Sequence, residues 1–192
     1  MKKELKELII NGINSWADTD IYALSLFVYD DCDNPCKPTV RLGYNTERKV
    51  QEEISNASNA DEARWNYAFW LQNSTFVFGE DDTADIVKKW ILTSGFPYYE
   101  EVDLWDDEDL NENGVPDDVE VITEEFVELL VEVVQEIHDE GILTKKFGKE
   151  LPIIIHELEY YDQIAFQNSV ANGKELVKDF TDWIMSMYEI SY

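Results

Sequence analysis

Apolar residues recur at three- and four-residue spacing in several stretches, a pattern that predicts amphipathic helices. The first stretch opens the chain, and its apolar face consists of Leu5, Leu8, Ile9, Ile13 and Trp16. The most regular one follows residue 122 and consists of Phe126, Leu129, Leu130, Val133, Val134 and Ile137. Gly141 stands just beyond it, where glycine closes many helices because it adopts the left-handed conformation.

Three further helices are predicted from less regular patterns. One has its buried face at Ile86, Val87, Trp90 and Ile91. Either Asp82 or Thr83 can cap it. Residues 63–71 (ARWNYAFWL) are apolar nearly all round, which predicts a buried helix. Asn172 with Glu175 resembles a capping box for a final helix. The residues that this helix is expected to bury are Leu176, Val177, Phe180, Trp183, Ile184 and Met187.

Short apolar runs between turn residues predict the strands. Residues 21–29 are apolar on both faces, as in a strand covered on both sides, and the turn-rich DDCDNPCKP joins them to 39–44 in an antiparallel hairpin. Residues 75–78 and 151–158 are the other candidate strands. The order of these elements predicts an α+β fold, with a small, mostly antiparallel sheet of three to four strands packed with several helices.

Residues 1–192 are predicted to form a single domain, because 44% hydrophobic content suits one core and no repeat divides the chain. An irregular acidic insertion is expected at about 95–120, where Gly95, Pro97, Gly114 and Pro116 interrupt regular structure. No window is apolar enough for a membrane span, and the N-terminus lacks a signal-peptide core. A cytoplasmic location is the expected default.

The charge of the chain restricts its partners. The formal net charge is −27, and residues 90–144 contain no Lys or Arg at all. Such a charge lies mostly on the surface and repels nucleic acid and anionic membranes, so neither is expected as a partner. A basic protein or a divalent cation is attracted instead.

The helix predicted after residue 122 carries a row of glutamates opposite its apolar stripe. Among them, Glu124, Glu128, Glu132 and Glu136 are predicted to contact a basic partner. A face of one sign can cover the basic groove of a nuclease or another cationic toxin. An ordinary solvated helix face explains the same residues.

Residues 109–120, DLNENGVPDDVE, fit the calcium-loop template D-x-[DN]-x-[DN]-G-x5-E at each specified position. Because calcium prefers oxygen ligands, the predicted ligands are Asp109, Asn111, Asn113, the carbonyl of Val115, Asp117 and Glu120. A paired EF-hand is disfavoured, because no helical pattern precedes the loop, no second loop exists and Pro116 has no N–H to donate. The alternative is a solvated turn that leads into a helix.

Other candidate residues give weaker signals. Cys32 and Cys36 are expected to be reduced thiols in a hairpin loop, with one local disulfide as the alternative. Glu157 and Glu159 share a face of the last predicted strand and suit acid–base chemistry, although an exposed sheet face explains them equally well. His156, which points the other way, is expected in the core.

Arg64 is one of only three arginines, and we expect it to form an ion pair or to stack on an aromatic ring. The chain contains no phosphate-binding glycine loop, no G-x-S-x-G and no zinc-ligand spacing. A binding protein is therefore favoured over an enzyme.

The segments DIYALSL (20–26), NTE (45–47) and EARW (62–65), with Trp70 and the late apolar strand, resemble a bacterial family, the domain-of-unknown-function family 4303. The resemblance covers most of the chain and implies a single α+β domain from a bacterium. Members resemble small acidic proteins that serve as immunity partners of bacterial toxins. The resemblance implies no catalytic residues, and the calcium-like loop is not part of it.

We therefore expect an acidic binding protein that acts as an immunity-type inhibitor of a basic toxin or nuclease. A calcium-binding module that uses loop 109–120 and an unrecognised enzyme remain the alternatives.

Overall fold

The computed structural model describes residues 1–100 and 122–189. Within these ranges the chain forms one four-stranded sheet in the order β3-β2-β1-β4. β1 (Ile21–Asp30) pairs antiparallel with β2 (Pro38–Thr46), which pairs antiparallel with β3 (Phe76–Phe78). On its other side β1 pairs in parallel with β4 (Ile153–His156). The predicted α+β class is confirmed, but the sheet is mixed rather than mostly antiparallel.

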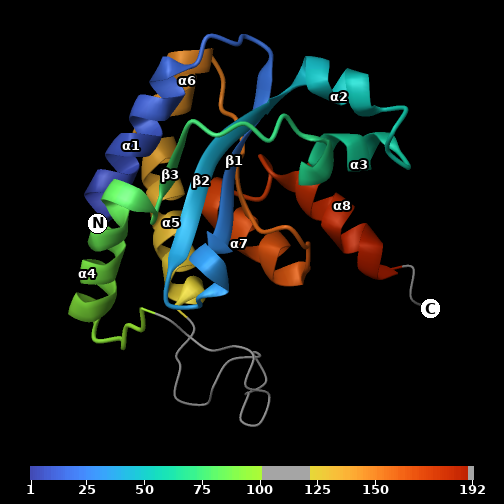
Figure 1. Cartoon of the computed structure of the whole chain (residues 1–192). Coiled ribbons are helices and arrows are strands. Elements are labelled where there is room, and N and C mark those ends of the chain that lie inside the picture. The colour runs from blue at the N-terminus through green and yellow to red at the C-terminus, as the bar shows by residue number, and fades with distance from the viewer. Residues whose placement is uncertain (101–121, 190–192) are drawn as a thin grey trace.

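The parallel pairing of β4 follows from the route of the chain after β3. The helices α4 (Ala84–Ser94), α5 (Thr123–Asp139) and α6 (Ile142–Phe147) lie between β3 and β4 in the sequence, on one face of the sheet. They return the chain to the end of the sheet where β1 begins (Figure 1). A parallel neighbour requires a crossover of this kind. An apolar run does not encode its direction, so the sequence pattern could not predict this pairing.

Helices cover both faces of the sheet (Figure 1). On one face, α1 (Lys2–Ser15) packs with α4, α5 and α6 against Leu24, Leu26 and Val28 of β1. The other face carries α2 (Glu47–Glu53), α3 (Ala60–Trp65) and α8 (Lys178–Glu189). The central strand β1 is thus buried on both sides, as predicted. Among the described residues, no helix combines the length and the apolar character that a membrane crossing requires.

The most regular helical patterns are confirmed. In α1, Leu5, Ile9 and Ile13 are fully buried, and in α5 the buried residues are Phe126, Leu130, Val133, Val134 and Ile137. Gly141 has the left-handed φ of 62° and donates its N–H to the carbonyl of His138, so it ends α5 as expected. These helices form where predicted because one continuous apolar stripe faces one core.

The single buried helix predicted for residues 63–71 is wrong. α3 ends at Trp65, and Asn66 is extended. The side chain of Asn66 accepts a hydrogen bond from the N–H of Ala68 and so begins a short 3-10 helix, η2 (Tyr67–Phe69). Asparagine favours such turns over helix interiors because its side chain competes for backbone hydrogen bonds. The run is apolar because its rings fill a core, with Trp65, Tyr67 and Trp70 buried.

The capping box predicted at Asn172 is also wrong. Asn172 ends a helix that the pattern did not predict, α7 (Asp162–Asn172), and the final helix α8 begins only at Lys178. Among the residues that the final helix was expected to bury, Phe180, Trp183 and Ile184 of α8 are buried and Met187 is exposed. Val177 and Leu176 precede α8; the first is buried and the second half-buried. α7 lies beside β4, and its position creates the site described next.

Candidate functional site

An open groove of about 800 Å³ lies between α5 and α7. Its floor is apolar, with Val127 and Val131 from α5 and Phe166 and Val170 from α7. Both pairs are four residues apart, so each forms a line along its own helix. Phe166 is 65% exposed and Val170 is 45% exposed. Clustered apolar side chains of this kind, open to solvent and rimmed by polar groups, are typical of contact surfaces.

Carboxylates surround the apolar floor. Glu124 and Glu128 project from α5, Glu157 follows β4, and Asp30 ends β1. Among the described residues that line the groove there is no lysine, arginine or histidine. The groove therefore suits a segment that is apolar on one side and positively charged along its edges.

The four glutamates predicted to contact a basic partner fall into two groups. Glu132 accepts from Lys2 at 2.8 Å, and Glu136 accepts from Lys2 at 2.7 Å and from Lys6 at 2.5 Å. These ion pairs join α5 to α1. Glu124 and Glu128 form no ion pair within the described residues, are exposed and line the groove, as Glu132 also does. The charge available to a partner is therefore concentrated at the N-terminal half of α5.

Asp30 is the most constrained carboxylate of the groove. Its Oδ1 accepts a hydrogen bond from Thr123 Oγ1, the first residue of α5, at 2.8 Å. Burial raises the pKa of Asp30 to about 6; the hydrogen bond from Thr123 opposes this shift, and the nearby charges of Glu157 and Asp33 add to it. Asp30 forms no ion pair within the described part of the chain, so its negative charge is not neutralised there.

The predicted carboxylate pair Glu157 and Glu159 does not share a strand face, because β4 ends at His156. Glu157 lines the groove, and its Oε1 accepts from the hydroxyl of Tyr161 at 3.0 Å. Burial raises the pKa of the Tyr161 phenol, and the charge of Glu157 adds to the shift, so the hydroxyl stays a donor. Glu159 is exposed. This arrangement removes the geometry on which an acid–base role was based.

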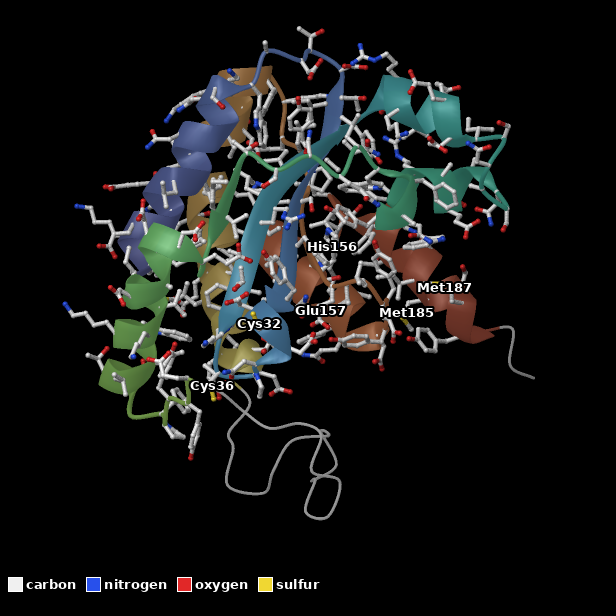
Figure 2. All side chains as sticks on the ribbon, viewed as in Figure 1. Cys32, Cys36, His156, Glu157, Met185 and Met187 are labelled. Carbon is white, nitrogen blue, oxygen red and sulfur yellow. The ribbon has the colours of Figure 1, made fainter. Side chains whose placement is uncertain are left out.

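His156 is a core histidine, as expected, although it forms a buried pair with Ser25. Ser25 Oγ and His156 Nε2 are 2.8 Å apart, and His156 Nδ1 lies 2.9 Å from the carbonyl of Glu157. The carbonyl can only accept, so Nδ1 carries the proton and Ser25 donates to Nε2. Both side chains are at most 2% exposed, and burial lowers the pKa of His156 to about 4. A substrate has no access to this buried pair, which we assign to the core; Figure 2 labels His156.

Arg64 has both roles that the sequence allowed. Its guanidinium donates to both carboxylate oxygens of Glu47, at 2.8 and 2.9 Å, and lies 4.0 Å from the ring centroid of Tyr22. The bond to Glu47 raises the pKa of Arg64 and lowers that of Glu47. A guanidinium engaged on both sides has little capacity left for an anion, so Arg64 holds α2 and α3 together.

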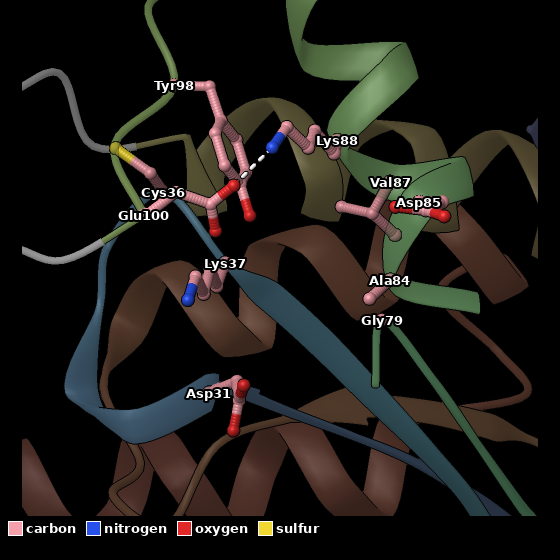
Figure 3. Close-up of a pocket in the computed structure, with 10 residues that line it drawn as sticks. All are labelled: Asp31, Cys36, Lys37, Gly79, Ala84, Asp85, Val87, Lys88, Tyr98 and Glu100. Carbon is pink, nitrogen blue, oxygen red and sulfur yellow. Dashed lines mark hydrogen bonds and ion pairs between the residues drawn. The ribbon is translucent and has the colours of Figure 1, made fainter. Parts of the chain in front are cut away.

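A smaller pocket of about 160 Å³ lies beside the β1–β2 loop (Figure 3). Lys88 pairs there with Glu100, and its ammonium lies 4.6 Å from the ring centroid of Tyr98. Lys37 also lines the pocket, together with the carboxylates of Asp31 and Asp85. Because the cations of this pocket lie among carboxylates of the same chain, we assign it a structural role. In the same loop, Cys32 is exposed and Cys36 is buried, and no disulfide joins them, as expected.

The predicted calcium ligands Asp109, Asn111, Asn113, Val115, Asp117 and Glu120 lie outside the described residues. Within residues 1–100 and 122–189, no group of three or more His, Cys, Asp or Glu side chains is placed to hold a metal ion. The calcium hypothesis therefore stays a prediction.

The apolar half of the groove was not predicted from the sequence. Phe166 and Val170 lie in α7, whose buried side is formed by other residues, among them Ile164 and Ala165, and Tyr161 directly precedes this helix. Apolar residues on two sides of one helix are the signal that could have indicated a contact surface. Polar residues between these apolar positions interrupt the helical pattern, so no helix was predicted there.

Comparisons with protein-family models, with curated proteins and with solved structures find no match for this chain. The resemblance to family 4303 stays a prediction.

Proposed function

We propose that this protein binds a basic, amphipathic segment of another protein in the groove between α5 and α7. The observation that carries the proposal is the apolar floor, with Phe166 65% exposed, beside carboxylates that have no basic neighbour among the residues lining the groove. An amphipathic helix bound in a hydrophobic groove is a common mode of recognition. α7 is 11 residues long, so the groove offers about 16 Å, or about three helical turns.

The charge of the chain favours a basic partner over other occupants. A second copy would bring another −27 charges to an acidic rim, and nucleic acid or an anionic membrane would be repelled in the same way. A cationic protein is attracted, and its association is accelerated at low salt. The free carboxylates Glu124 and Glu128 are suited to guide it to the apolar floor.

The biological role that we propose is that of an immunity-type inhibitor of a basic toxin or nuclease. The formal net charge of −27 supports this role, because it attracts a basic protein. Its test requires a basic toxin whose gene lies beside the gene for this protein, and the absence of such a gene would contradict the role. The wild-type protein should abolish the toxin's activity, and the double charge reversal Glu124→Lys with Glu128→Lys should restore it. Inhibition that survives the reversal would contradict a role for the groove.

The binding proposal can be tested with a synthetic probe. The probe is a peptide of about three helical turns, with leucine at i, i+3, i+4 and i+7 and lysine elsewhere, and the control peptide has the same composition in scrambled order. Because Phe166 is the largest exposed side chain of the floor, Phe166→Ser should weaken binding about tenfold. Leu92→Ser is the matched control, since Leu92 is 55% exposed on α4, away from the groove.

The charge contribution has a matched control as well. Glu124→Gln with Glu128→Gln removes two rim carboxylates, and Glu52→Gln with Asp61→Asn removes two exposed carboxylates from α2 and α3. Only the first pair should slow association and weaken binding. Equal binding of the ordered and scrambled peptides, or equal effects of the two double variants, would show that net charge alone attracts the probe and would overturn the proposal.

A further inference from the structure

We infer that Asp30 is the specificity residue of the groove: it pairs with a lysine or arginine side chain of the bound segment, and this pairing makes binding weaken in mild acid. The inference rests on the proposed function. It adds which residue of the groove recognises the positive charge of the bound segment, and by what chemistry.

The geometry places Asp30 where an incoming cation can reach it. Asp30 ends β1, lines the groove and is partly buried. Thr123 donates to Oδ1 at 2.8 Å and so holds the carboxylate in one orientation. Oδ2 has no hydrogen-bond partner among the described residues. An ammonium or guanidinium group satisfies such an oxygen through a charge-assisted hydrogen bond, which is stronger than a neutral one.

The surroundings of Asp30 favour a cation over any other ligand group. The ionisable groups whose charges act on it are Asp33 from η1 (Asp31–Asp33) and Glu157, which follows β4, and Glu124 and Tyr161 line the same groove. The charges of Glu157 and Asp33 oppose the charge of Asp30, and Glu124 adds a further carboxylate to the same groove. A cationic side chain relieves this repulsion. A calcium ion is a poorer occupant, because it needs six to eight oxygens and no group of three or more ligating side chains occurs in the described structure.

Binding is linked to the proton on Asp30. With a pKa of about 6 in the free protein, this carboxyl is ionised at neutral pH and protonated in mild acid. A bound cation favours the ionised form, so association below pH 6 must release a proton from Asp30 to solvent. Each pH unit below that value then weakens binding up to about tenfold, while a group that stays ionised makes no such contribution.

The test measures the affinity of the leucine/lysine peptide by calorimetry at about pH 7.5 and about pH 5. The peptide has no histidine, so its own charge is constant over this range. Asp30→Asn keeps an oxygen that can accept from Thr123, which favours retention of the fold, and thermal unfolding checks this. Glu128→Gln is the matched control, because it removes a rim charge without touching Asp30.

We expect wild-type affinity to fall about tenfold between the two pH values, and Asp30→Asn to bind about tenfold more weakly at pH 7.5 with little pH dependence. Glu128→Gln should keep the wild-type pH dependence. If Asp30→Asn binds as tightly as the wild type with the same pH dependence, the inference is overturned and the groove proposal stands. If the wild type binds the ordered and the scrambled peptide equally well, the proposed function itself is overturned, and the inference about Asp30 with it.

Discussion

The side-chain amide of Asn168 makes the two backbone hydrogen bonds that a neighbouring strand would make to Ile155. Its Oδ1 accepts from the N–H of Ile155 at 2.8 Å, and its Nδ2 donates to the carbonyl of Ile155 at 2.7 Å. One helical turn later, Asn172 repeats the arrangement on Ile153, at 2.7 and 2.9 Å. The open edge of β4 is thereby closed by a helix, which protects it from pairing with another chain. The same bonds fix the wall of the groove that α7 provides.

Replacement of Asn168 by alanine should lower the free energy of unfolding by about 1–3 kcal/mol, because the buried N–H of Ile155 loses its acceptor. The carbonyl of Ile155 keeps the hydrogen bond from Gln167 Nε2. Urea unfolding measures the change. Gln163→Ala, an exposed position in the same helix, is the control and should change stability by less than about 0.5 kcal/mol. A similarly small effect of Asn168→Ala would show that water or Gln167 replaces the amide at the strand edge.

Asp30→Asn should stabilise the protein at neutral pH by about 1–2 kcal/mol, a value reduced for partial solvent screening. The pKa of Asp30 is raised from 3.8 to about 6 in the folded state, so the ionised carboxylate disfavours folding above pH 6. This penalty disappears as the pH falls through 6 towards 3.8. Urea unfolding at several pH values measures it. Asp61→Asn, which removes an exposed carboxylate of α3 that does not line the groove, is the control, and equal effects of the two variants would contradict the prediction.

The effect of His156 on the pH dependence of stability should be opposite to that of Asp30. The pKa of His156 is lowered from 6.5 to about 4 in the folded state, so between these pH values the unfolded chain binds an additional proton. The free energy of unfolding therefore decreases as the pH is lowered from 6.5 to 4. From pH 7 to pH 5 the loss from His156 is about 2 kcal/mol. Because Asp30 partly compensates over the same range, the Asp30→Asn background shows the effect most clearly.

Nuclear magnetic resonance gives an independent check of the same prediction. The ring protons of His156 should show no titration between about pH 7 and pH 5. A midpoint near the ordinary histidine value would mean that the Ser25–His156 pair is accessible to solvent. In that case the assignment of this pair to the core would be wrong.

Loop 109–120 makes a prediction that does not depend on the groove. The calcium hypothesis predicts binding heat at about millimolar calcium or below, which Asp109→Ala abolishes because the first carboxylate ligand is lost. The solvated-turn alternative predicts no heat from either protein. Asp61→Asn removes one charge from α3 and controls for a general loss of negative potential.

Local pattern alone was sufficient to predict α1, α5, β1 and β2. Their burial follows from the spacing of residues such as Leu5, Ile9 and Leu130, and this spacing is a property of the sequence. The core position of His156 and the structural role of Arg64 were predicted correctly for the same reason: their immediate neighbours indicate their surroundings. The overall charge, which is also a property of the sequence, is the basis on which a basic partner was predicted.

Only the tertiary structure decided α7, the direction of β4 and the groove. Asn168 and Asn172 are poor helix formers in isolation, and their burial becomes favourable only when the edge of β4 supplies partners for their amides. The pairing of Glu136 with Lys2 and Lys6, far apart in the sequence, likewise arises from the packing of α1 on α5. The sequence therefore determined how much negative charge the protein carries, whereas packing determined that Asp30, Glu124 and Glu128 remain available beside an apolar floor.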